Sequence, residues 1–162
     1  MPPAPAADPT SASVELDAAP RDVLAVLLDV EAYPRWITTM REATVLERDA
    51  DGRPSRMRVD QAAGPVRDAW SADVVWRLGV DGAASVQWRM AEPGSILTAL
   101  DVVWELEPTG GTGRPAGTQV TYRLSLRSKV AMVGLLRSKL ERLVADSALA
   151  DLRRAMARSG TG

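Results

Sequence analysis

Apolar and polar residues alternate through most of the middle of the chain, from position 43 to position 126. A period of two is typical of strands that bury one face and expose the other. The alternation is plainest in segments 66–76, 86–90, 96–106 and 120–126. Consecutive strands with short connections predict an antiparallel meander of about six strands.

Turn residues divide this region. Asp51-Gly52 and Asp81-Gly82 are hairpin signals, and Gly64-Pro65 and Pro93-Gly94 mark two further turns. A Gly/Pro/Thr-rich stretch at 107–117 predicts the longest loop. Its glycines lack the following helix and lysine of a phosphate-binding loop, so we interpret it as a connection only.

Other elements precede the meander. Residues 11–16 alternate and predict a first strand. A helix should begin at Pro20, because the first helical position does not need the missing N–H, and apolar residues recur through 23–28. Pro34 should interrupt or restart this helix. The pattern therefore predicts two short helices after the first strand.

A helical pattern without Gly or Pro runs from Leu135 to Ser159. Its apolar residues fall on two stripes, which predicts a helix that packs on more than one side. We expect the first stripe to be the main buried one. The first stripe holds Leu136, Leu140, Leu143, Val144 and Ser147, and the second holds Leu149, Leu152 and Met156.

These elements predict an α+β fold in which a curved antiparallel sheet of six or seven strands wraps around a long C-terminal helix. A twisted sheet with one apolar face needs a cover, and the last helix is the only predicted element long enough to supply it. We expect a single domain over 11–159, which is a usual domain size. The Pro/Ala-rich residues 1–10 are predicted to be a disordered tail.

The absence of cysteine and histidine restricts the chemistry. It removes disulfides, thiol nucleophiles, thiolate metal sites and the commonest general base. No zinc spacing or nucleophile elbow is present, so we expect no metal and no cofactor. Any catalysis would have to use carboxylates, hydroxyls or basic side chains.

Charge and hydropathy limit the partners. A net charge of −1 argues against a nucleic-acid partner, which normally requires a basic excess. The N-terminal residues do not resemble a secretory signal, and no apolar run is long enough to span a bilayer, so we expect a cytoplasmic protein without stable membrane insertion. The basic residues of the last helix are typical of a solvated face; attraction to an anionic membrane surface is the alternative. The Ala-, Arg-, Val- and Gly-rich composition is typical of GC-rich bacterial genomes.

Tryptophan is concentrated on the apolar faces of the predicted strands. Four of the five tryptophans lie there, and the chain has no phenylalanine. Large rings either pack into a dense core or leave irregular space for a ligand, and both interpretations stay open. If a cavity exists, the predicted lining residues are Met57, Asp68, Trp70, Trp88, Met90, Leu100, Trp104, Tyr122, Leu136, Leu140 and Leu143.

Asp68 and Tyr122 are the candidate catalytic residues. Asp68 lies between Val66 and Trp70 on the apolar face, where a carboxylate is costly unless it is paired or hydrogen-bonded. It is either a wet or paired group at the rim, or a ligand anchor or acid/base with a raised pKa. Tyr122 could donate a hydrogen bond to a ligand or reach solvent. Thr98 is expected to be a third inward polar group.

Two motifs carry a resemblance to a known family. The sequence LDAAPRDV at 16–23 is followed by DVEAYPRW at 29–36, and together they are similar to the opening of the START-like superfamily. More narrowly, the chain resembles the bacterial polyketide cyclase/dehydratase and lipid-transport (SRPBCC) group, over residues 11–158. The resemblance implies a helix-grip fold with a hydrophobic cavity between the sheet and the last helix.

The leading functional hypothesis is therefore a carrier or binding protein for a hydrophobic small molecule such as a lipid, a quinone or a polyketide-like compound. The alternative is a polyketide cyclase/dehydratase that uses Asp68 as acid/base and Tyr122 as hydrogen-bond donor. A weaker third hypothesis is a regulator that binds another protein. The sequence does not decide the ligand or the oligomeric state.

Overall fold

The computed structural model describes residues 9–63, 65–110, 117–129 and 134–159. Within these residues seven strands form one antiparallel sheet in the order β1-β7-β6-β5-β4-β3-β2. The strands are β1 (Thr10–Leu16), β2 (Met40–Arg48), β3 (Pro54–Ala63), β4 (Val66–Leu78), β5 (Ala84–Glu92), β6 (Leu97–Thr109) and β7 (Gly117–Ser128). The helices are α1 (Pro20–Leu28), the 3-10 turn η1 (Val30–Ala32), α2 (Tyr33–Trp36), the 3-10 turn η2 (Val80–Gly82) and α3 (Gly134–Ser159).

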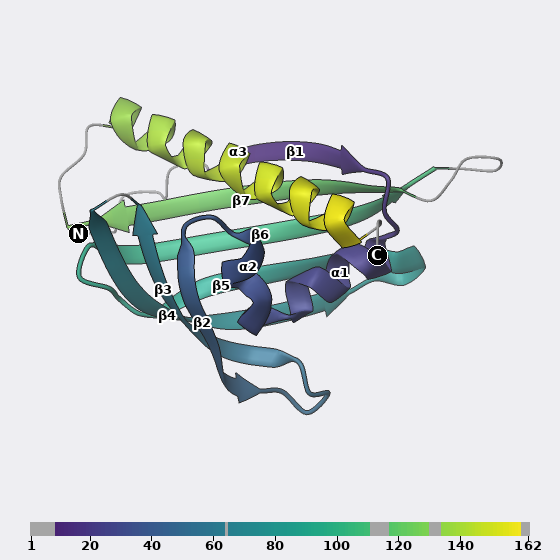
Figure 1. Ribbon diagram of the computed structural model, residues 1–162, viewed down its shortest axis with the longest axis horizontal. Coiled ribbons are helices and arrows are strands. Elements are labelled where there is room, and N and C mark those ends of the chain that lie inside the picture. The colour runs from purple at the N-terminus through teal and green to yellow at the C-terminus, as the bar shows by residue number, and fades with distance from the viewer. Residues whose placement is uncertain (1–8, 64, 111–116, 130–133, 160–162) are drawn as a thin grey trace, which may run out of the picture.

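The predicted architecture is confirmed. Strands β2 to β7 form the meander, and β1 closes the far side of the sheet by pairing with β7. The sheet is curved, and α1, α2 and α3 lie on its concave side (Figure 1). β1 begins at Thr10, which falls within the tail expected at 1–10, and residues 1–8 lie outside the described residues.

The helices between β1 and β2 follow from two prolines. Pro20 occupies the start of α1, as predicted, and Val23 and Leu27 are completely buried beneath that helix. Pro34 lies at the start of α2, where its missing N–H is harmless. The Tyr33 hydroxyl donates a hydrogen bond to the Leu27 carbonyl, which would otherwise lack a partner at the end of α1. This bond holds the two short helices together.

The predicted inward face of β6 is wrong at the beginning of the strand. The register of β6 against β7 shifts between Leu97 and Ala99, so the alternation is broken there. Thr98 is consequently exposed rather than inward. From Leu100 onward the alternation is as predicted, with Leu100, Val102 and Trp104 buried.

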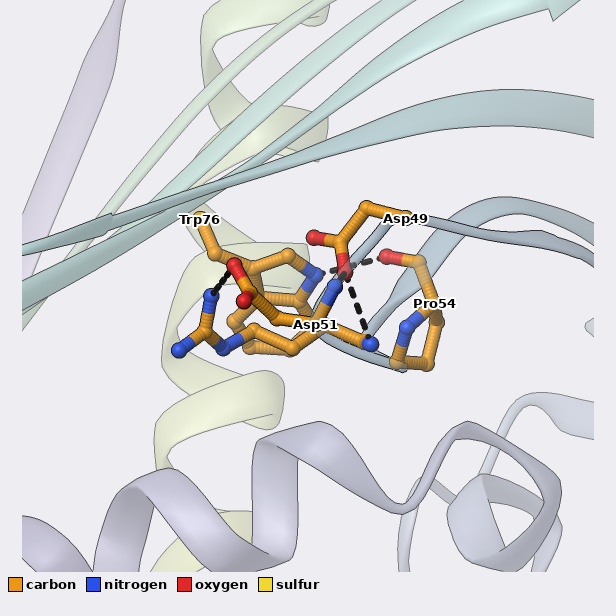
Figure 2. Close-up of polar contacts among 5 residues, drawn as sticks. Asp49, Asp51, Pro54 and Trp76 are labelled. Carbon is orange, nitrogen blue, oxygen red and sulfur yellow. Dashed lines mark hydrogen bonds and ion pairs between the residues drawn. The ribbon is translucent and has the colours of Figure 1, made fainter.

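Trp76 lies away from the other ring systems. It sits near the end of β4, where its indole N–H donates to the Pro54 carbonyl over 2.6 Å (Figure 2). The adjacent turn is held by Asp49, whose carboxylate accepts the backbone N–H groups of Asp51 and Arg53. Trp76 therefore supports the β2–β3 hairpin, although it shares a strand face with Trp70.

Two buried carboxylates attach α3 to the rest of the fold. Glu141 accepts hydrogen bonds from the Thr10 hydroxyl and the Leu126 backbone N–H, each over 3.0 Å. Asp151 accepts the Thr38 N–H over 3.0 Å and the Thr38 hydroxyl over 2.8 Å, and it pairs with Arg154. The first set of bonds joins α3 to β1 and β7, and the second joins it to the segment after α2. The helix is therefore tied both to the β1–β7 edge of the sheet and to the segment that leads into β2, the strand at the opposite edge.

The prediction that the first stripe of α3 is the main buried one is wrong. Leu136, Leu140 and Leu143 are 57%, 39% and 68% exposed, whereas Ala145, Leu149 and Leu152 are buried. The buried face also contains Glu141 and Asp151. Hydrophobic periodicity could not identify this face, because two of the side chains that define it are acidic.

Removal of the Glu141 carboxylate should destabilise the fold. The variant Glu141→Ala leaves the Leu126 N–H without its acceptor, and an unsatisfied buried donor costs about 1–3 kcal/mol. Asp146→Ala, which removes an exposed carboxylate from the same helix, is the matched control. Urea unfolding of both variants measures the difference. Equal free energies of unfolding would show that Glu141 does not anchor α3.

Candidate ligand-binding cavity

A cavity of about 400 Å³ lies between the concave face of the sheet and α3. The sheet supplies most of its wall, the segment after α2 supplies one side, and α3 supplies the cover. The lining residues are Ile37, Thr39, Met40, Gln61, Ala62, Ala63, Val66, Asp68, Trp70, Trp88, Ile96, Leu97, Leu100, Val102, Trp104, Tyr122, Leu124, Leu126, Leu140, Leu143, Val144, Ser147, Ala148 and Asp151.

Aromatic rings form the inner part of the wall. Trp88 and Trp104 lie on adjacent strands with ring centroids 5.9 Å apart, and Tyr122 packs edge-on against Trp104 at 4.6 Å. Tyr33 and Trp36 extend this cluster from α2, against Trp88 and Trp104 respectively. Edge-to-face contacts of this kind are favourable beyond the area that they bury. The cluster gives the cavity a stiff, apolar floor.

The rim of the cavity is apolar. On α3, Leu140, Leu143 and Val144 line the cavity and are also partly exposed, so this stretch of helix borders both the cavity and solvent. Val66, at the start of β4, lines the cavity and is 50% exposed. The cavity therefore meets solvent at apolar side chains, both on α3 and at the β3–β4 end of the sheet.

Eight of the predicted lining residues border the cavity: Asp68, Trp70, Trp88, Leu100, Trp104, Tyr122, Leu140 and Leu143. Three do not. Met57 is completely buried between Val45 and Ala72 in the sheet, Met90 is half-buried on β5, and Leu136 is largely exposed. Whether the eight residues contact a ligand stays a prediction.

Sequence reasoning missed part of the wall. Ile37 lies between α2 and β2, and Met40 is the first residue of β2; neither was expected to reach the cavity. Leu124 and Leu126 share the inward face of β7 with Tyr122, so the alternation of that strand contained the signal. Tyr33 and Trp36 were recognised only as part of a family motif, and their ring contacts depend on the packing of α2 against the sheet.

Asp68 holds the β5–β6 connection. Its carboxylate accepts the backbone N–H groups of Ser95, Ile96 and Leu97 over 2.6, 3.3 and 2.8 Å, and that of Ala69 over 3.1 Å. Hydrogen bonds from backbone N–H groups to a carboxylate are among the stronger ones in proteins. Gly94 is required for this arrangement, because a Cβ at that position would overlap the Asp68 carboxylate oxygens.

These contacts favour the structural interpretation of Asp68 over the catalytic one. The side chain is 7% exposed, and both oxygens are engaged by the main chain. Its partners are backbone N–H groups, whereas the sequence suggested a wet position at the rim or a paired side chain. A general base needs an oxygen that can accept a substrate proton, and Asp68 would have to release the β5–β6 connection to provide one.

Tyr122 is a polar group on the inner wall, which Thr39, Gln61 and Ser147 also border with polar side chains. It is 4% exposed, and its hydroxyl has no hydrogen-bond partner among the described residues. Burial raises its pKa well above the usual value for tyrosine. The hydroxyl therefore stays protonated at physiological pH and can donate a hydrogen bond into the cavity.

Two further findings concern metal binding and membrane spans. Among the described residues, no group of three or more acidic side chains lies close enough to hold a metal ion. No helix in the described part of the chain is both long and apolar enough to cross a membrane.

The fold and the cavity define a class: a helix-grip domain that encloses an apolar pocket between a curved sheet and a long terminal helix. The chain belongs to the polyketide cyclase / dehydrase and lipid transport family, whose pattern it matches over residues 16–153. No curated protein matches the chain significantly.

Solved structures share this fold. A START superfamily protein from Mycobacterium smegmatis is 21% identical, with a TM-score of 0.81, and the match covers 94% of this chain and 99% of the other. A STAR-related lipid transfer protein from Xanthomonas axonopodis is 19% identical, with a TM-score of 0.72 and coverages of 91% and 84%. An aromatase/cyclase from a Streptomyces species is 17% identical, with a TM-score of 0.69 and coverages of 94% and 93%.

Substitutions at the Asp68 contact should destabilise the protein. In Asp68→Asn the amide nitrogen faces backbone donors, and in Gly94→Ala the new methyl group displaces the carboxylate, so we expect each to cost about 1–3 kcal/mol. Asp17→Asn and Ser95→Ala, at exposed positions, are the matched controls. The measurement is chemical denaturation. Stabilities of Asp68→Asn and Gly94→Ala equal to those of the controls would contradict the assigned role.

The two tyrosines predict an alkaline limit. Tyr33 and Tyr122 are the only tyrosines, and burial raises the pKa of both, that of Tyr33 with a further contribution from Asp29. Above pH ~10 the unfolded chain loses phenolic protons that the folded protein keeps, so the free energy of unfolding falls as pH rises. Tyrosinate absorbance should therefore appear only together with unfolding. The prediction would be contradicted if tyrosinate absorbance rose with a midpoint near pH 10 while the circular dichroism spectrum stayed that of the folded protein.

Proposed function

We propose that the protein binds a hydrophobic small molecule in the cavity between the sheet and α3, and that it acts as a carrier or binding protein. The observation that carries the proposal is the cavity itself. Protein interiors are normally close-packed, and a space of about 400 Å³ has the volume of roughly a dozen water molecules. Its size lies within the usual range for small-molecule sites.

The lining supports an apolar ligand. Most of its residues are aliphatic or aromatic, and the two carboxylates that border it are engaged in hydrogen bonds within the protein. Water in such a space would find few partners, so an apolar molecule would replace it favourably. The exposed leucines of α3 at the rim provide an apolar route into the cavity.

The comparisons agree with this proposal at the level of the family. The family description includes lipid transport, and one protein of the same fold is a STAR-related lipid transfer protein. We propose a lipid, a quinone or a polyketide-like compound as the ligand class. The composition supports a bacterial protein, and the net charge of −1 supports one without a nucleic-acid partner. A cytoplasmic location is part of the same proposal.

We do not adopt the cyclase alternative, although an aromatase/cyclase shares the fold. It required Asp68 as acid/base together with Tyr122, and the hydrogen bonds of Asp68 to the β5–β6 connection oppose the first of these roles. Tyr122 alone can orient a ligand but cannot take up a proton at neutral pH, because it already holds one. The regulator hypothesis stays a prediction.

Filling the cavity should abolish binding of an apolar probe. The probe is N-phenyl-1-naphthylamine, which is uncharged and becomes fluorescent in apolar surroundings. We expect saturable binding by the native protein and at least a tenfold loss in Ala148→Trp, whose indole would occupy the space beside α3. Ala150→Trp, at an exposed position on the same helix, should bind normally.

The same experiment can contradict the proposal. Equal binding by Ala148→Trp and Ala150→Trp would place the probe elsewhere on the protein, and no binding by the native protein would remove the basis for a carrier. Native mass spectrometry of protein from its own host provides an independent measurement. An apolar molecule that copurifies with the native protein, but not with Ala148→Trp, would identify the ligand.

A further inference from the structure

The polar groups around the cavity have an unequal distribution of charge. Among its described lining residues there is no lysine and no arginine, whereas Asp68 and Asp151 are both present. The chain as a whole is nearly balanced, with 20 basic and 21 acidic residues. The absence of cations is therefore a local property of the wall.

Asp68 is not compensated by a cation. Four backbone N–H groups surround it, and it forms no ion pair with any described residue. Asp151 pairs with Arg154, but that guanidinium is 57% exposed and does not line the cavity. A ligand carboxylate inside the cavity would lose its hydration, meet the uncompensated charge of Asp68 and find no cationic partner among the described lining residues.

The basic residues near the rim do not change this balance. Arg137 and Lys139 flank the exposed leucines of α3 but do not line the cavity. Arg142 is turned toward β1, where it donates to the Ser11 carbonyl over 3.3 Å. An anionic group could meet the first two only outside the cavity, where water and salt weaken the interaction.

One hydrogen-bond donor on the inner wall lacks an acceptor, and the other uncharged polar lining residues, Thr39, Gln61 and Ser147, come from other parts of the wall. The Tyr122 hydroxyl has no hydrogen-bond partner among the described residues. The indole N–H groups of Trp70, Trp88 and Trp104 have none either, but their nitrogen atoms are fully buried, so Tyr122 is the donor that a ligand in the cavity can reach. Buried donors without acceptors are costly, so a ligand that brings an acceptor oxygen gains affinity by supplying the missing partner.

We infer that the cavity selects uncharged apolar molecules that carry a hydrogen-bond acceptor, such as a ketone, quinone, ester or amide oxygen, and that it rejects carboxylate amphiphiles such as free fatty acids. The inference rests on the proposed function and specifies the chemistry of its ligand. Tyr122 is the residue that donates to the acceptor oxygen. The uncompensated carboxylate of Asp68 and the lack of a cation among the described lining residues supply the selection against anions.

Three naphthalenes of nearly equal size provide the test: 2-acetylnaphthalene, 2-naphthoate and 2-ethylnaphthalene. Isothermal titration calorimetry at neutral pH, where naphthoate is ionised, measures each affinity. We expect the ketone to bind most tightly, the hydrocarbon about tenfold more weakly, and the carboxylate at least tenfold more weakly than the ketone.

Two sets of variants assign these differences to residues. Tyr122→Phe should lower the affinity for 2-acetylnaphthalene about tenfold and leave that for 2-ethylnaphthalene unchanged. Ser147 lines the cavity from an exposed position on α3, so Ser147→Arg adds a cation at the rim and Ser147→Gln is its uncharged control. Only the arginine should increase naphthoate affinity relative to that of the ketone.

The outcomes separate the two proposals. If naphthoate binds the native protein as tightly as the ketone, and Ala148→Trp abolishes both, the carrier proposal stands and the charge selection is wrong. If the ketone and the hydrocarbon bind equally, or Tyr122→Phe weakens both, the role of the acceptor is wrong. If none of the three binds, the proposed function fails, and the inference fails with it.

Discussion

The attachment of α3 by Glu141 and Asp151 is the constraint on which the cavity depends. A helix that covered the sheet by apolar packing alone would bring its leucines down onto the strands and fill the space. Here two buried carboxylates fix the helix to β1, β7 and the segment after α2. Leu140, Leu143 and Val144 are therefore left at the rim, and the space beneath them stays open.

Asp68 is a third buried carboxylate that holds a segment of the fold by accepting backbone hydrogen bonds. Asp68, Glu141 and Asp151 are all buried, and each accepts backbone N–H groups from a segment that has lost its regular partner. Leu126 lies beyond the end of the β1 ladder, Thr38 follows α2, and residues 95–97 form the β5–β6 connection. Hydrogen bonds to charged acceptors are among the stronger ones, which explains how a sheet with an open interior keeps its shape.

The strands could be predicted because their signal is local. Alternation placed Asp68, Trp70, Trp104 and Tyr122 on the inward face, and the structure agrees at each position. Turn residues and prolines located the connections and the two short helices. The resemblance to the family then supplied the arrangement of sheet and helix, which no local pattern contains.

The rest could not be predicted, because it depends on contacts between distant segments. The buried face of α3 includes Glu141 and Asp151, whose partners lie more than a hundred residues away in the case of Thr10 and Thr38. A hydrophobic pattern ranks such residues as outward. The role of Asp68 likewise depends on a loop 27–29 positions further along the chain. The sequence pattern thus predicts which face of a strand a side chain lies on, but it does not predict which distant residue that side chain contacts.

The two attachment points also fix the length of helix that lies above the cavity. Glu141 and Asp151 are ten residues apart, so at 1.5 Å per residue they fix a span of helix about 15 Å long. Leu143, Val144 and Ser147 lie within that span and border the cavity. A single hydrocarbon chain or a fused ring could slide beneath such a span edge-on, while the bonds at both ends remain closed. Loading and release would then require no unfolding of the sheet, and a molecule longer than the chamber could leave its tail outside, beside α3.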